Sequence, residues 1–139
     1  MIVHHPDRAV AEGIIKRALS ELARLERIFS LYRSDSALVE LNRRGVLLNP
    51  PDDFIVLLNE CDRCWRISGG AFDPTVQPLW NLYCRHFSQP GHDPNGPRVD
   101  QLREAVDTVG FDKVAFNTER IVFARRGMGM TLNGIAQGF

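Results

Sequence analysis

The longest hydrophobic pattern in the chain lies near its beginning and predicts one amphipathic helix from Pro6 to Tyr32. Apolar side chains recur there at steps of three and four residues: Val10, Ile14, Ala18, Leu22, Leu25, Phe29 and Tyr32. Arginine and glutamate residues fall largely between them. Proline suits the first turn of a helix, because that turn leaves its amide groups without intrahelical partners. We expect the apolar stripe to face a core, with the ring of Tyr32 half-buried at its end.

Shorter patterns follow this helix. The segment from Ser34 to Ser36 ends it and supplies capping side chains for a short helix from Ala37 to Arg43. Gly45 then turns the chain into a short strand from Val46 to Leu48. A second amphipathic helix is predicted from Asp52 to Ser68, with acidic side chains near the positive end of its dipole.

The second half of the chain predicts helices first and strands afterwards. Two helices, from Leu79 to Phe87 and from Val99 to Val109, are separated by a turn region rich in proline and glycine. Two strands follow, from Lys113 to Asn117 and from Arg120 to Ala124, and a third is predicted from Met128 to Leu132. This order favours an α+β fold, with long N-terminal helices packed on a mainly antiparallel sheet, over a doubly wound α/β fold.

The composition of the chain argues against several classes of function. The 139 residues are about one domain in size, and 44% are hydrophobic, so the chain can bury a core. Lys plus Arg and Asp plus Glu number 17 each, which gives no whole-chain attraction for nucleic acid. A local patch of Arg24, Arg27 and Arg33 is more simply read as a solvated helix face. No apolar run approaches the ~20 residues of a membrane span, and no signal peptide is evident.

Three cysteines are too few for a disulfide scaffold. Cys61 and Cys64 form a Cys-x-x-Cys motif, which admits a redox interpretation or a packing one. A reactive motif of this kind normally begins a helix, where the dipole lowers the thiol pKa, whereas this one lies inside a predicted helix. The position favours packing. A zinc site would need two further ligands, and the nearest, Cys84 and His86, match its spacing poorly.

The segment from Asn133 to Gly138 is the first candidate for chemistry. A strand that runs into a helix start built from small residues presents amide groups without intrahelical partners, which can bind an anion. Gly134 would let a phosphate approach the backbone, and Gln137 could add a hydrogen bond. A tight contact between helix and sheet explains the same small residues equally well.

The segment from Gly70 to Thr75 is the second candidate. Asp73 precedes a proline, which holds it in an extended conformation, so that its carboxylate can be aimed at a ligand. Phe72 beside it could stack on a planar ring. Taken alone, the stretch favours the simpler interpretation, in which Asp73 caps the turn and Phe72 belongs to the core. Tyr32 is a third candidate, with closure of the core as its simpler role.

Three sequence blocks together resemble the FAD:protein FMN transferase family, the ApbE-like flavin transferases. They are the Ser-x-Tyr…Asp-Ser…Leu-Asn block at Ser30 to Asn42, the Gly-Ala-Phe-Asp-Pro-Thr block at Gly70 to Thr75, and the block from Thr131 to Phe139. The resemblance implies a T-fold-like α+β architecture. It also implies that residues 1–139 are the N-terminal portion of a single transferase domain whose C-terminal part is absent.

The resemblance implies an enzyme that moves the FMN half of FAD onto a Thr or Ser hydroxyl of an acceptor protein. AMP is released, and Mg²⁺ assists. The implied partner is that acceptor protein, and no nucleic-acid partner is expected. The implied location is the periplasm or cell envelope, with a possible lipid anchor in the full-length protein.

The resemblance also assigns residues to roles. The implied FAD contacts are Tyr32, Ala71, Phe72, Asp73, Thr131 and Gln137. The backbone carbonyl of Gly134 is an implied magnesium ligand, with the others beyond Phe139, and no catalytic residue is assigned. The family usually has Asp at position 131 and Lys or Glu at position 137. These departures leave open a flavin-binding or inactive homologue that has lost transfer, and a purely structural role for the motifs.

Overall fold

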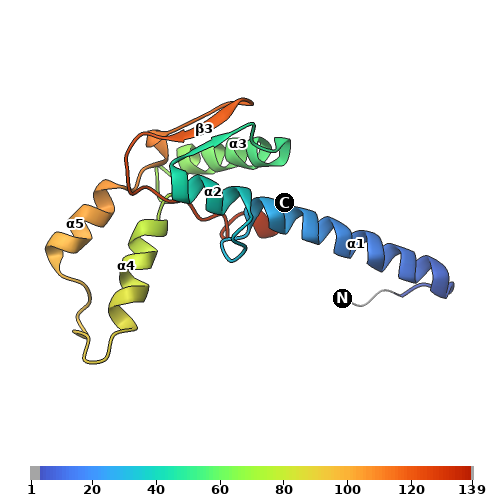
Figure 1. Cartoon of the computed structure of the whole chain (residues 1–139), viewed down its shortest axis with the longest axis horizontal. Coiled ribbons are helices and arrows are strands. Elements are labelled where there is room, and N and C mark those ends of the chain that lie inside the picture. The colour runs from blue at the N-terminus through green and yellow to red at the C-terminus, as the bar shows by residue number, and fades with distance from the viewer. Residues whose placement is uncertain (1–3, 139) are drawn as a thin grey trace.

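A three-stranded antiparallel sheet lies beside the central helices of the chain in the computed structural model, which describes residues 4–138 (Figure 1). Strand β3 (Arg120–Phe123) lies in the middle, with β1 (Val46–Leu48) on one side and β2 (Val114–Phe116) on the other. Each predicted strand of the sheet is found within one residue of its expected bounds. The α+β class predicted from the sequence is confirmed.

Helices α2 (Ala37–Arg44) and α3 (Asp52–Ile67) carry the core. The hydroxyl of Ser36 accepts a hydrogen bond from the amide of Val39 at 3.1 Å, which caps α2 as the sequence predicts. Gly45 ends the same helix at φ 71°, a left-handed conformation that glycine adopts without steric cost.

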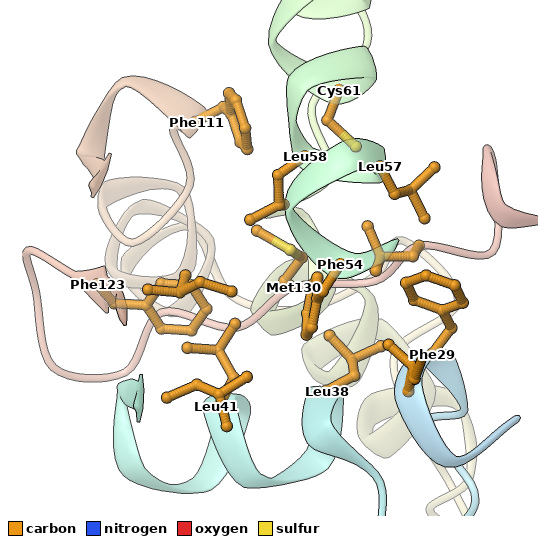
Figure 2. Close-up of a cluster of buried hydrophobic side chains, with 14 of the residues drawn as sticks. Phe29, Leu38, Leu41, Phe54, Leu57, Leu58, Cys61, Phe111, Phe123 and Met130 are labelled. Carbon is orange, nitrogen blue, oxygen red and sulfur yellow. The ribbon is translucent and has the colours of Figure 1, made fainter. Parts of the chain in front are cut away.

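Figure 2 shows Phe54 of α3 directed towards Leu38 of α2, and Leu58 on the side of Phe123. Phe54 and Leu58 are fully buried, and so are Leu38 and Leu41 of α2 and Met130 near the end of the chain. The rings of Phe29 and Phe54 meet edge to face with centroids 5.8 Å apart. The segment that follows the sheet therefore belongs to the same core as the two helices.

Helix α1 (Arg8–Phe29) projects from this body (Figure 1). It begins one residue after Asp7, whose carboxylate caps it, so Pro6 precedes the helix and does not occupy its first turn. Among its apolar residues only Ile28 and Phe29 are buried, while Leu19 and Leu22 are about half exposed. The expectation that the whole stripe faces a core is therefore wrong for residues 4–138. Contact with the body is confined to the C-terminal part of α1, where Leu25 packs against the core and Arg24 pairs with Asp53 of α3 at 2.5 Å.

Tyr32 also departs from its expected position, because its side chain is 90% exposed. The helix ends at Phe29, and Ser30 redirects the chain: its carbonyl accepts a hydrogen bond from the Ser36 hydroxyl at 2.6 Å. Tyr32 therefore follows the helix and does not close the core.

Helices α4 (Gln77–Phe87) and α5 (Val99–Asp107) lie side by side as an arm on the other side of the body from α1 (Figure 1). Helix α4 begins two residues earlier than expected, because Pro78 suits its first turn. Helix α5 ends two residues early, and the ammonium group of Lys113 donates hydrogen bonds to the carbonyls of Asp107 and Val109. This contact satisfies carbonyls that a helix end leaves without partners.

The prediction of a strand from Met128 to Leu132 is wrong, because this stretch forms only an isolated bridge between Val76 and Gly129. The side chain of Asn42 takes the place of a neighbouring strand. Its amide nitrogen donates to the carbonyl of Met130 at 2.8 Å, and its oxygen accepts from the amide of Met130 at 2.7 Å. These bonds satisfy the buried backbone without a sheet.

The helix predicted after Asn133 is present only as a three-residue 3₁₀ turn, η2 (Ala136–Gly138). The amides of Ile135 and Ala136 both donate to the carbonyl of Leu132, so they are not free for an anion. The predicted helix start is therefore absent within residues 4–138, while binding of an anion by the neighbouring backbone stays a prediction. Phe139, the last residue of the motif, lies outside the described residues. Over the described range no helix has the length and apolar character of a membrane span.

Candidate functional site

One open cleft with a volume of about 1660 Å³ lies where the three motif segments meet. Tyr32 lines it from the first block, Ala71 to Asp73 from the second, and Thr131 and Gly134 from the third. Pockets for drug-sized ligands are roughly 300 to 1000 Å³, so this cleft has space for a larger ligand such as a dinucleotide.

The second and third motif segments are in direct contact. The amide of Thr131 donates a hydrogen bond to the carbonyl of Pro74 at 2.8 Å. A Cβ placed on Gly134 would lie 3.8 Å from the ring of Phe72, so the ring lies against this backbone. The Phe72–Asp73 bend and the backbone near Asn133 thus line the same cleft, as the resemblance requires. Gln137 is exposed on η2 and is not among the residues that line it.

The carboxylate of Asp73 holds the loop together. One oxygen accepts hydrogen bonds from the amide of Thr75 at 2.8 Å and from its hydroxyl at 2.6 Å. The other oxygen accepts from the amide of Phe111 at 2.9 Å. These contacts agree with the simpler interpretation of Asp73 as a turn cap. An Asp followed two residues later by its amide partner is a known turn signal, which could have identified Thr75 from the sequence.

Thr75 extends this network to the residues that follow α5. Its side chain is fully buried, and its hydroxyl accepts a hydrogen bond from the amide of Gly110 at 2.7 Å. Gly110 has φ 145°, and a Cβ there would lie 2.6 Å from a carboxylate oxygen of Asp112. Only glycine suits this position. The network therefore fixes the motif loop to the segment that connects α5 with the sheet.

Basic side chains dominate the cleft although the whole chain is neutral. Five arginines line it, against two acidic residues: Arg43, Arg44, Arg85, Arg125 and Arg126, with Asp73 and Glu104. Arg44 pairs with Glu40 at 2.8 Å, whereas Arg43 and Arg126 form no ion pair with any described residue. The cleft therefore suits an anionic ligand, and unpaired guanidinium groups suit phosphate. Sequence reasoning missed these two arginines, since nothing in the local sequence distinguishes them.

Residues 4–138 do not by themselves fit a magnesium ion. They contain no group of three His, Cys, Asp or Glu side chains that could hold a metal. The carboxylate of Asp73 is already bonded to two amides and a hydroxyl, which leaves the carbonyl of Gly134 as the one implied ligand. A bound magnesium ion would therefore need further ligands from outside this range.

Neither cysteine of the Cys-x-x-Cys motif lines the cleft. Cys61 is fully buried in the core, and burial raises the pKa of its thiol from 9.0 to about 12. The thiol therefore stays protonated at neutral pH, whereas a redox cysteine reacts as the thiolate. The packing interpretation of Cys61 is supported, and the described residues provide no four-ligand zinc site around Cys84 and His86.

Comparison with known proteins agrees with the three motif blocks. The family described as the ApbE family matches residues 2–139. A FAD:protein FMN transferase of Haemophilus influenzae is 31% identical over 117 residues, which cover 79% of this chain and 33% of that protein. The chain thus spans about a third of the length of this curated relative.

Solved structures agree in fold. The crystal structure of the flavinyl transferase ApbE of Pseudomonas stutzeri, in its apo form, has a TM-score of 0.76 at 26% identity and covers 96% of this chain and 41% of that one. The flavin transferase ApbE of Vibrio cholerae has a TM-score of 0.75 at 23% identity and covers 97% and 44%. At that identity the second likeness establishes the fold alone.

Proposed function

This chain belongs to the ApbE family, and from that premise we propose that the protein transfers FMN from FAD to an acceptor protein. A Thr or Ser hydroxyl of the acceptor attacks the phosphorus on the FMN side of the pyrophosphate. The bond between that phosphorus and the bridging oxygen breaks, AMP leaves with the bridging oxygen, and the proton of the hydroxyl passes to solvent as the phosphoester forms. Magnesium assistance, and a periplasmic or envelope location, are part of the same proposal.

The observation that carries this proposal is the locally basic cleft at which the three motif segments meet. A pyrophosphate is an anion, and negative charge moves onto the leaving phosphate as its bond breaks. Arg43 and Arg126 have no carboxylate partner among the described residues, so their charge is available to such a ligand. Fixed positive groups stabilise developing negative charge without reorganisation during the reaction. In this proposal the two arginines hold the pyrophosphate.

A transfer assay tests the proposal. The full-length protein is mixed with FAD, Mg²⁺ and an acceptor that carries a threonine target. We expect an acceptor band that fluoresces under ultraviolet light after denaturing electrophoresis, with one AMP released for each flavin attached. An acceptor with valine in place of the threonine should stay dark, since valine has no hydroxyl.

A second candidate function is flavin binding without transfer. Thr131 favours it, because a neutral hydroxyl lines the cleft where the family usually has a carboxylate. The same assay separates the two candidates. Tight FAD binding with no covalent flavin under any divalent metal would support the second candidate and contradict transfer.

A further inference from the structure

Trp80 is an exposed aromatic residue on the wall that α4 contributes to the cleft. Its side chain is 65% exposed, whereas its neighbours Leu79 and Leu82 are half-buried. A tryptophan ring has a large apolar face, and stacking a planar ring against it removes much apolar surface from water. Among the described residues this makes Trp80 a stacking surface that the core does not use.

Helix α4 carries two amide side chains: that of Gln77, three residues before Trp80, and that of Asn81, four residues after Gln77. Gln77 and Asn81 also line the cleft, and residues at spacings of three and four are neighbours on a helix surface. The side-chain nitrogen of Gln77 donates a hydrogen bond to the side-chain oxygen of Asn81 at 2.8 Å. This bond leaves the oxygen of Gln77 as an acceptor and the nitrogen of Asn81 as a donor. If both amides were turned over, one acceptor and one donor would still remain.

An adenine ring matches this pair. Its exocyclic amino group donates a hydrogen bond, and the adjacent ring nitrogen accepts one, which is the pattern that Asn and Gln side chains recognise in adenine. Stacking on an aromatic side chain is the other common contact to a base. Trp80 would provide the stacking face, and the paired amides of Gln77 and Asn81 would provide the edge contact.

The beginning of α4 is held next to the third motif segment. Val76 and Gly129 form a parallel bridge, and a Cβ on Gly129 would lie 3.6 Å from the Cβ of Gln77. The α4 wall is therefore anchored beside the backbone that leads to Thr131. A ligand could contact both the α4 wall and the basic residues of one continuous cleft.

We propose that Trp80, Gln77 and Asn81 form a purine subsite that binds the adenine ring of a nucleoside diphosphate group. This inference rests on the proposed function, because it assigns the AMP half of FAD to the α4 wall. The diphosphate would lie towards the basic residues Arg43 and Arg126, and the flavin would lie outside the subsite.

Binding measurements on the full-length protein test the subsite with three probes: ADP, FMN and inorganic pyrophosphate. Relative to the unsubstituted protein, Trp80→Ala should weaken ADP binding about tenfold or more, which is the range for the loss of one base stack. The affinities for FMN and pyrophosphate should stay within twofold of the unsubstituted values, because neither molecule carries adenine. Trp80→Phe, which keeps an aromatic face, should retain most of the ADP affinity. Phe87→Ala removes another exposed aromatic ring from α4, outside the cleft, and should leave all three affinities unchanged.

The outcomes separate the subsite from the transfer reaction. If Trp80→Ala weakens FMN binding as much as ADP binding, or leaves ADP binding unchanged, the proposal of a purine subsite is wrong. If ADP binds in a Trp80-dependent way but the transfer assay yields no covalent flavin, the subsite stands and transfer fails. If the unsubstituted protein binds none of the three probes, the subsite is also wrong.

Discussion

We expect Asp73→Ala to lower the free energy of unfolding by about 3 kcal/mol, because the change removes an ionised acceptor from three hydrogen bonds. The amide of Phe111 and the buried hydroxyl of Thr75 would lose their acceptor. Thermal unfolding of the full-length protein measures the effect, and we expect a fall of about 5 °C in the melting temperature. The loop that carries Phe72 would lose its fixed position, so FAD binding should weaken as well.

Asp107→Ala is the matched control for this prediction. It removes an exposed carboxylate that has no hydrogen bond or ion pair from its side chain to the described residues. Such surface substitutions usually change stability by less than about 0.5 kcal/mol. An Asp73→Ala protein that melts like the unsubstituted protein but has lost FAD affinity would contradict the structural role, and would place the carboxylate directly on the ligand.

The second large effect should come from the unpaired arginines of the cleft. We expect the double substitution Arg43→Gln and Arg126→Gln to weaken FAD binding by about 100-fold, since a hydrogen bond to a charged group contributes about 1.5 kcal/mol or more. The affinity should also become less sensitive to salt, because fewer charges face the phosphates. Titration of FAD at two salt concentrations measures both effects.

Arg17→Gln combined with Arg103→Gln controls for net charge. Both arginines are exposed, neither lines the cleft, and the pair removes the same amount of charge. We expect FAD affinity to stay within about twofold of the unsubstituted value. Equal losses in the two double variants would mean that overall charge attracts FAD, and that Arg43 and Arg126 do not contact it.

Local patterns in the sequence were enough to predict most elements of the fold. The period of α3 and the alternation of β2 and β3 are properties of neighbouring residues, and capping by Ser36 depends on one adjacent turn. The apolar stripe of α1 was also found, but amphipathic spacing says which face is apolar and not whether a partner covers it. Exposure of Leu19 and Leu22 could not be predicted in that way.

Contacts between distant residues explain the remaining differences. The segment around Met130 looks like a strand, yet a side chain 88 positions away provides its hydrogen bonds. No local pattern contains that contact. The motif blocks predicted which segments meet at the cleft, while Arg43, Arg126 and Trp80 became candidates only when the fold placed them on its walls.

Hydrogen–deuterium exchange of the full-length protein, with and without FAD, is the most direct test of where the dinucleotide binds. We expect FAD to slow amide exchange in residues 71–76 and 128–134, two segments that line the cleft, and to leave residues 8–22 of α1 unchanged. Protection confined to other segments, with unchanged exchange in both of these, would contradict the assignment of the cleft to FAD.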